Sequence, residues 1–252
     1  MPENYTEDYL LDKKVKIFQP TDGYRASSDA VLLSAMVSSV KSGARIIDIG
    51  SGTGAISLCL AQRLQNLSPH IEGVELQPEL VTLANMSARA DNFEFVHFHQ
   101  ADIRQKINLP GLSPCSFDIA VSNPPYSEHD MPSPNASKAA AHNHHDFDLV
   151  QWLNFCLKML KPFGRLYLVH RAENLPQICA ALQNKAGAQT ILPIYSKTSQ
   201  TAKRIIVSAQ KDSKAPCRIL PAFVTHNHDG KYTEAAEKVL RQGLSFEDIL
   251  RI

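Results

Sequence analysis

Short apolar runs alternate with longer amphipathic segments along the chain from about Ala44 onward. A short apolar run bounded by Gly, Pro or polar residues predicts a buried strand, and apolar residues three or four positions apart predict a helix. Predicted strands cover residues 45–50, 70–75, 93–97, 117–121, 165–170, 190–195 and 204–209. Predicted helices cover residues 55–65 and 146–160, and another begins at Gln77-Pro78-Glu79.

Strands that alternate with helices of roughly 10 to 15 residues favour βαβ units with right-handed crossovers. The sequence therefore predicts an α/β fold, with a mainly parallel sheet covered by helices on both faces. Residues 1–43 add a predicted strand at 15–20 and a helix over 28–40, and residues 212–252 add a helix over 233–242. We expect both ends to be extensions of one domain, whose core spans residues 44–211.

The composition excludes several classes of protein. Lys and Arg number 26 against 25 Asp and Glu, a net charge of +1, which excludes a polycation that binds nucleic acid by bulk charge alone. No apolar run approaches the roughly 20 residues of a membrane-spanning helix, and the polar opening residues do not resemble a signal peptide. The five cysteines are scattered without a C-x-x-C pair, which favours a reducing compartment. We therefore expect a cytoplasmic protein without a membrane partner.

A glycine-rich loop joins the first core strand to its helix, in the stretch Asp48-Ile-Gly-Ser-Gly-Thr-Gly54. Glycines let the backbone turn sharply and approach a ligand closely at a helix N-terminus. Glu75 ends the next strand, where a carboxylate is placed to bind the hydroxyls of a ribose. With Ala55, the loop also fits the dinucleotide pattern G-x-G-x-x-A, so these residues alone leave an NAD site open.

A second motif, Asn123-Pro-Pro-Tyr126, follows the predicted strand at 117–121. The two prolines restrict the backbone, so the Asn123 side chain and the Pro124 carbonyl are held rigidly at the edge of the sheet. Their two acceptor oxygens form a clamp for a planar NH2 group, and Tyr126 offers an aromatic face to the ring that carries it. The motif therefore indicates chemistry on an amino group.

The motifs together resemble a known series. The glycine loop, Glu75, Ala101-Asp102 and Asn123-Pro-Pro-Tyr126 resemble the motifs of class I S-adenosylmethionine (SAM) methyltransferases that act on amino groups. The flanks, which are Phe18-Gln-Pro with Gly23-Tyr-Arg-Ala-Ser-Ser-Asp-Ala-Val-Leu-Leu33, Lys203-Arg-Ile-Ile-Val and Asp229-Gly-Lys-Tyr-Thr, resemble the bacterial tRNA1(Val) adenine-37 N6-methyltransferase family. This resemblance implies a Rossmann-like fold with a mainly parallel seven-stranded sheet, SAM as cofactor and tRNA as substrate.

The resemblance also implies roles for single residues in holding SAM. Gly50, Gly52 and Gly54 are expected under its methionine part, with Asp48 ordering the loop. Glu75 is expected on the ribose hydroxyls and Asp102 on the adenine amino group. Ser28 and Asp29 are expected to close over the methionyl end, and here Ser28 stands where the family often has Thr, which keeps a hydroxyl.

The resemblance gives the catalytic roles to Asn123, Pro124 and Tyr126, and Asn123 is also expected to contact the cofactor. An adenine amine is a poor nucleophile because its lone pair is delocalised into the ring. Hydrogen bonds from both amine protons to Asn123 and Pro124 are expected to expose that lone pair, so that positioning and electrostatics supply most of the acceleration. Adenine must leave its stack to enter such a site, and loop bases do so at least cost.

Other functions remain open at this stage. Glutamine-N5 methyltransferases of release factors share Asn-Pro-Pro-Tyr, but usually carry a separate N-terminal helical domain, and only about 43 residues precede the first core strand here. Adenine-N6 methylation of rRNA or DNA is a third alternative, and a guanine-N2 enzyme is disfavoured by Tyr126. A SAM-binding or NAD-binding module without transfer activity is the alternative outside enzymes.

Two weaker patterns favour ordinary explanations. His142, His144 and His145 lie near acidic residues without a matching ligand pair elsewhere, so we expect no metal site. A basic stretch (Lys13, Lys14, Lys16, Arg25) and three further cations (Lys138, Lys203, Arg204) are surface charges taken singly. Taken together, they fit the basic rim that is expected around the site of a tRNA enzyme.

Trp152 is expected in the core. The sequence leaves the oligomeric state open.

Overall fold

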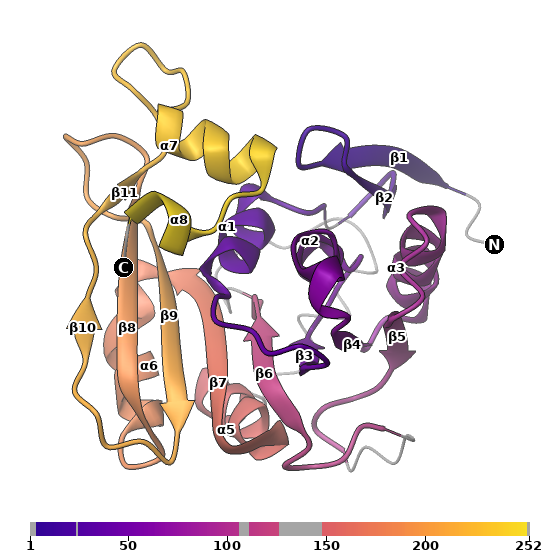
Figure 1. Cartoon of the computed structure of the whole chain (residues 1–252), viewed down its shortest axis with the longest axis horizontal. Coiled ribbons are helices and arrows are strands. Elements are labelled where there is room, and N and C mark those ends of the chain that lie inside the picture. Colours follow the sequence, from indigo (N-terminus) through magenta and orange to yellow (C-terminus); the bar gives the residue numbers. More distant parts are fainter. Residues whose placement is uncertain (1–3, 24, 106–110, 126–147, 251–252) are drawn as a thin grey trace.

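The computed structural model describes residues 4–23, 25–105, 111–125 and 148–250 (Figure 1). The strands are β1 (Tyr5–Leu10), β2 (Val15–Pro20), β3 (Arg45–Ile49), β4 (His70–Glu75), β5 (Val96–Gln100), β6 (Phe117–Ser122), β7 (Leu160–Arg171), β8 (Ala186–Tyr195), β9 (Arg204–Lys211), β10 (Arg218–Ile219) and β11 (Phe223–Val224). The α-helices are α1 (Ser28–Met36), α2 (Ala55–Leu64), α3 (Pro78–Ala90), α5 (Leu149–Met159), α6 (Leu175–Leu182), α7 (Glu234–Glu237) and α8 (Phe246–Leu250). Short 3-10 helices span Gln65–Leu67 and Ala172–Asn174, and a π-helix spans Lys238–Gln242.

One large sheet organises the described residues, in the order β10-β8-β9-β7-β6-β3-β4-β5 with β11 also beside β8. The strands from β5 to β7 run parallel, and β9 runs antiparallel between β7 and β8. The hairpin β1-β2 forms a separate two-stranded sheet. Because β3, β4, β5 and β6 are parallel, their carboxyl ends meet at one edge, where ligands bind in open α/β sheets.

Helices cover both faces of the sheet, as the sequence predicts (Figure 1). On one face, α1, α2 and α3 pack in one apolar cluster with residues such as Ile46, Val121 and Val169. On the other face, α5 and α6 pack in a second cluster with Ile47, Ala120 and others. Successive strand residues point to opposite faces, so strands buried on both faces carry continuous apolar runs such as Ile205-Ile206-Val207 of β9. Among the described helices, none is long and apolar enough to cross a membrane.

The structure departs from the sequence prediction at several boundaries. The seven expected strands are present, but β10 and β11, of two residues each, extend the sheet beside β8. Strand β5 begins at Val96 instead of residue 93, because the Phe93 N–H caps the end of α3 on the Ala88 carbonyl at 2.9 Å. Helix α1 ends at Met36 because Val37 is extended. The predicted helix at 233–242 divides into α7 and the π-helix.

Candidate active site

The glycine loop between β3 and α2 adopts the left-handed backbone at all three glycines. The φ angles of Gly50, Gly52 and Gly54 are +72°, +54° and +84°, a region that only glycine enters without steric cost. A Cβ at Gly50 would lie 2.8 Å from the Trp152 ring, and one at Gly54 would lie 2.5 Å from the Phe98 ring. The loop is therefore a close-packed backbone cradle at the N-terminus of α2.

Two strand ends hold this cradle in place. The Gly50 and Ser51 N–H groups both donate to the Val74 carbonyl, at 2.9 and 3.0 Å. Glu75, the last residue of β4, accepts hydrogen bonds from the Gly52 N–H at 2.9 Å and from the Gln77 N–H at 3.0 Å. The structure thus brings the predicted carboxylate directly against the predicted loop.

Asp48 lies beneath the loop and is fully buried. One oxygen of its carboxyl accepts a hydrogen bond from the Ser57 hydroxyl at 2.8 Å. Burial raises the pKa of Asp48 to about 7, and the negative charge of Glu75 acts in the same direction. The side chain therefore lies close to the boundary between its neutral and charged forms at neutral pH.

Asn123 follows the last residue of β6, beside the glycine loop. Strand register pairs Ser122 with Ile49, so Asn123 and Gly50 leave neighbouring strands at the same edge. The Ser122 hydroxyl donates to the Ile49 carbonyl at 2.6 Å and accepts from the Trp152 indole at 2.9 Å. Pro124 is buried and Pro125 is exposed. Tyr126 lies outside the described residues, as do residues 127–145 with their histidines.

Four buried polar atoms at this edge have no hydrogen-bond partner among the described residues. They are Asp48 Oδ1, Ser51 Oγ, Thr53 Oγ1 and Asn123 Oδ1. A buried polar atom left unpaired costs about 1–3 kcal/mol, so buried polar groups are nearly always satisfied. Three of these atoms belong to the loop stretch and the fourth to the amide beside it, which is the pattern of a site for a polar ligand.

Asp102 lies at the same edge, after β5, but its carboxylate binds its own neighbours. Arg104 donates to it from Nε at 2.7 Å and from the backbone N–H at 3.0 Å. The hydrogen bonds to Arg104 hold the pKa of Asp102 below its ordinary value. The segment is joined to the cradle through its backbone, since the Ala101 N–H donates to the Glu75 carbonyl at 2.9 Å.

Comparison with known proteins decides which ligand this edge holds. Residues 40–221 match the family model described as a methyltransferase domain. Over 169 residues the chain is 31% identical to the tRNA1(Val) (adenine(37)-N6)-methyltransferase of Tolumonas auensis, which covers 67% of this chain and 68% of the relative. The chain belongs to this methyltransferase family.

Two further comparisons extend this result. The enzyme of the same name from Haemophilus influenzae (strain PittGG) is 28% identical over 236 residues, 91% of this chain and 95% of that one. A solved structure of a predicted O-methyltransferase from Agrobacterium tumefaciens is similar with a TM-score of 0.71 and 21% identity, over 86% of this chain and 98% of the other. The latter similarity shows the fold, which is that of a Rossmann-like class I methyltransferase.

The methyltransferase uses SAM, and the edge fits this molecule. SAM carries a charged amino-acid part, a ribose and an adenine, so it needs polar partners along its whole length. The unpaired oxygens of Ser51 and Thr53, the closely packed glycines and the Glu75 carboxylate offer such partners over the ends of β3 and β4. The residues present therefore fit the cofactor, and family membership removes NAD as an alternative.

Helix α1 begins at Ser28, as the sequence predicts. The N-cap is Ser27, whose hydroxyl accepts from the Asp29 N–H at 3.2 Å, whereas Ser28 is the exposed first residue of the helix. Asp29 is buried and forms an ion pair with Arg204 of β9 at 3.1 Å. Arg204, which the sequence suggested as a phosphate-binding cation, instead joins α1 to the sheet in this structure.

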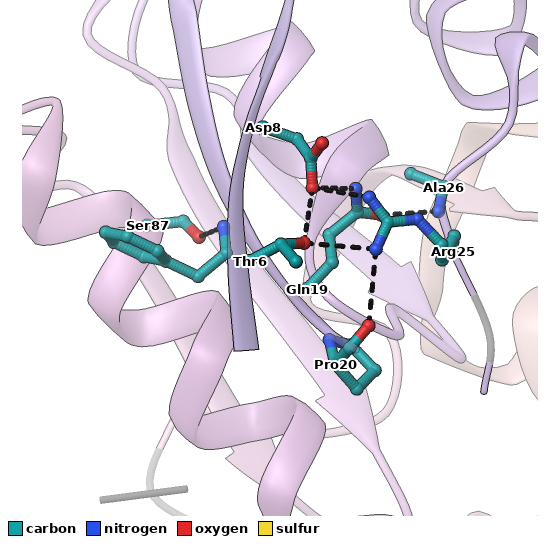
Figure 2. Close-up of polar contacts among 8 residues, drawn as sticks. Thr6, Asp8, Gln19, Pro20, Arg25, Ala26 and Ser87 are labelled. Carbon is teal, nitrogen blue, oxygen red and sulfur yellow. Dashed lines mark hydrogen bonds and ion pairs between the residues drawn. The ribbon is translucent and has the colours of Figure 1, made fainter. Parts of the chain in front are cut away.

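A polar network in the hairpin β1-β2 positions the segment before α1 (Figure 2). One oxygen of Asp8 accepts from Thr6, Gln19 and Arg25, at 2.7, 3.1 and 2.6 Å. The side-chain amide oxygen of Gln19 (Oε1) accepts from the Ala26 N–H at 2.6 Å. Figure 2 shows these side chains converging between the hairpin and residues 25–26, so the hairpin fixes the backbone that leads to Ser28 and Asp29.

Sequence reasoning missed three parts of this site. Trp152, expected only as a core residue, forms a wall of the cradle and binds Ser122. Arg25 and Lys16, expected as a basic rim, pair with Asp8 and Glu7 of β1. No alternation of apolar and polar residues signals these pairs or the strand, because Thr6, Glu7 and Asp8 are consecutive polar residues within Tyr5–Leu10.

Proposed function

We propose that this methyltransferase transfers the methyl group of SAM to the N6 atom of an adenine in tRNA, in the anticodon loop at the position-37 region. The name of the relatives supports the substrate. The observation that carries the chemistry is the Asn123 amide oxygen, which is buried and has no partner among the described residues at the edge where the cofactor binds. A protein that acts on tRNA is expected in the cytoplasm.

The residues of the edge divide into two groups in this proposal. Gly50, Gly52 and Gly54 hold the methionine part of SAM, and Asp48 orders their loop from below. Glu75 binds the ribose, and its bond to the Gly52 N–H keeps the carboxylate in place. Asp102, released in part from Arg104, binds the adenine of the cofactor. Ser28 and Asp29 close the methionyl end.

Asn123, Pro124 and Tyr126 hold the target base. When bound, SAM supplies a methyl group already activated by a positively charged sulfur. The Asn123 amide oxygen and the Pro124 carbonyl each accept one hydrogen bond from the adenine amine, so the nitrogen lone pair turns toward the methyl group. The Trp152–Ser122–Ile49 hydrogen bonds brace the end of β6 behind Asn123, so the amide keeps its direction. No side-chain base is required before the transfer, because the amine loses its proton to water only after the nitrogen–carbon bond has formed and the methyl–sulfur bond has broken.

The test is methyl transfer to defined substrates. Purified protein and methyl-labelled SAM are incubated with unmodified tRNA and, separately, with a release factor, and the digested products are identified by mass spectrometry. The proposal predicts N6-methyladenosine in the tRNA fraction. Label in the release factor alone would assign glutamine-N5 methylation. Label only in rRNA or DNA, tested as further substrates, would retain the adenine chemistry and overturn the tRNA assignment.

A further inference from the structure

A groove with a volume of about 490 Å³ lies away from the glycine loop, on the sheet face that α1 covers. Its floor is one face of β6, β7 and β9. On these strands Arg165 of β7 is paired with Ile119 of β6 on one side and with Gln210 of β9 on the other. Its walls are residues 36–44 after α1 and the start of α8, which lies beside α1. None of the residues of the cradle or the amide clamp lines this groove.

The groove carries an excess of positive charge. Its charged lining consists of Lys41, Lys161, Arg165 and Arg218 with Asp118 and Glu247. Lys161 pairs with Asp118 at 2.7 Å. Lys41, Arg165 and Arg218 form no ion pair with any residue that the structure describes. In a chain with a net charge of only +1, three such cations around one groove are a local concentration that favours an anionic ligand.

An exposed aromatic residue stands on the rim of the groove. The Phe163 side chain is 63% exposed. Its φ of +60° lies in the left-handed region, and among the described residues it is the one aromatic residue with such a backbone. The register of β6 and β7 places residues 161–164 in a bulge, and Gln210 donates to the Phe163 carbonyl at 3.1 Å. A bulky side chain in this conformation is uncommon and strained, so an exposed ring here is a candidate for function.

We propose that this groove is a second tRNA-binding surface, in which Lys41, Arg165 and Arg218 bind backbone phosphates and Phe163 stacks on an unpaired base. Cations beside an exposed aromatic ring match the two chemical parts of a single-stranded nucleotide. The proposal rests on the tRNA substrate inferred above. The basic rim expected from the sequence comprised Lys13, Lys14, Lys16, Arg25, Lys138, Lys203 and Arg204. Of these, Lys16, Arg25 and Arg204 form ion pairs in the structure, and the groove supplies a separate set of cations.

The position of the groove suits a contact away from the target base. Asp118 of the groove and Asn123 of the clamp are joined by strand β6, a separation of roughly 17 Å at ~3.3 Å per residue. A phosphate backbone that passes the clamp can reach this distance within a few nucleotides. Contacts of this kind add affinity and salt dependence without acting on the transferred methyl group.

The test compares two double variants that each remove two positive charges. Arg165→Gln/Arg218→Gln changes the groove. Lys158→Gln/Lys185→Gln is the control, since Lys158 is an exposed residue of α5 and Lys185 follows α6, both on the opposite face of the sheet. The dissociation constant for tRNA is measured between 50 and 300 mM salt, together with KM for tRNA, kcat and the dissociation constant for SAM.

The groove variant is expected to raise KM for tRNA about tenfold. The slope of log affinity for tRNA against log salt concentration is expected to become shallower by roughly 1.4 to 1.8, which is 0.7 to 0.9 for each of the two lost phosphate contacts. The kcat and the affinity for SAM stay unchanged, and the control variant matches the wild type. Phe163→Gly is expected to weaken tRNA binding about 5- to 100-fold. Its melting temperature stays level or rises, because glycine accepts the left-handed backbone.

The results separate the two proposals. If the wild-type protein binds and methylates tRNA while the groove variants do so with unchanged KM and salt slope, the groove assignment is wrong and the proposed function stands. If the wild-type protein neither binds nor methylates tRNA, the proposed function fails and this surface fails with it. A fall in melting temperature of Phe163→Gly that matches its loss of affinity would assign the ring a structural role.

Discussion

The carboxyl edge of the sheet and the groove on its face differ in backbone conformation, in the pairing of their polar and charged groups and in the size of the ligand that each suits. At the edge, backbone in the left-handed region belongs to glycines, four buried polar atoms have no partner among the described residues, and Arg204 is paired with Asp29. In the groove, the left-handed backbone carries Phe163, and Arg165 and Arg218 have no described ion pair. The edge is shaped to enclose a small polar molecule, whereas the groove presents side chains to a large one.

This difference explains where each region tolerates change. In the cradle the backbone is in close contact with the rings of Trp152 and Phe98, so a methyl group added at Gly50 or Gly54 would clash with one of these rings. The groove is open, so a changed side chain alters its charge or stacking while the fold is retained. Variants at the edge are therefore expected to alter stability and cofactor binding, and variants in the groove to alter the binding of nucleic acid.

The largest effect is expected from Gly54→Ala. Its Cβ would lie 2.5 Å from the Phe98 ring, which is buried, and its φ of +84° is strained for alanine. We expect a loss of about 2–5 kcal/mol in the free energy of unfolding, from strain and overpacking together. Gly43→Ala is the control, because φ is +68° there and nothing lies within 4 Å. Urea unfolding that shows equal losses for the two variants would refute the close-packed cradle.

The second effect is a pH dependence of opposite sign in the two regions. Because burial raises the pKa of Asp48 to about 7, the folded protein keeps this proton between about pH 4 and 7 while the unfolded chain loses it. The contribution of Asp48 to stability therefore falls as pH rises through this window. Between pH 5 and pH 8, Asp48→Asn should gain about 2–3 kcal/mol of unfolding free energy relative to the wild type.

Asp118 in the groove provides the contrast. Although burial acts to raise the pKa of Asp118, the hydrogen bonds from Lys161 and the Arg45 N–H, together with the positive charges of Lys161 and Lys41, outweigh it and hold the pKa below 3.8. Its stabilising contribution is thus present above the unfolded pKa and is lost as pH falls through the folded one. Asp118→Asn should flatten the acid limb of stability and leave the change between pH 5 and pH 8 intact. The same profile for both variants would contradict the distinction.

A smaller effect is expected on the cofactor. Glu75→Ala removes the acceptor of the Gly52 N–H and the proposed ligand of the ribose. We expect affinity for SAM to fall about 10- to 100-fold in isothermal titration, the equivalent of one or two hydrogen bonds to a charged group. Glu79→Ala, an exposed acid in the first turn of α3, is the matched control and should bind SAM normally.

The smallest effect is the coupling between Asp29 and Arg204. Their side chains are 12% and 34% exposed, so a double-mutant cycle with Asp29→Asn and Arg204→Gln should give a coupling energy of about 1 kcal/mol. The exposed pair Glu237 and Arg241 should give about 0.3–0.5 kcal/mol. Equal coupling energies in the two cycles would show that the edge does not depend on its paired cation.

The carboxyl edge was largely predictable because its parts are local in the sequence. Each strand end is followed at once by its functional residue, as in Ile49 before Gly50 and Ser122 before Asn123, and parallel pairing then brings these ends together. The loop, Glu75 and Asn123 lie together as expected. The roles of the single site residues, and the division of the chain at residues 43 and 211, stay predictions.

The rest depends on packing between distant segments. Asp29 and Arg204 are 175 positions apart, and the groove combines residues from seven helices and strands, so no local pattern indicates either. Ser27 takes the N-cap that a pattern of adjacent hydroxyl residues assigns equally to Ser28. Strand β1 is defined by its hairpin partner, because Thr6, Glu7 and Asp8 form a polar run without apolar alternation and no residue of Tyr5–Leu10 is fully buried.

The central claim is that the Asn123 amide acts chiefly on the amine of the substrate and contributes little to SAM affinity or to the fold. The direct measurement is the single-turnover rate of methyl transfer to unmodified tRNA by Asn123→Ala at saturating SAM, with SAM affinity measured in parallel. The account predicts a rate about 100- to 1000-fold below that of the wild type, with SAM affinity within a factor of about two. A wild-type rate in this variant would contradict it.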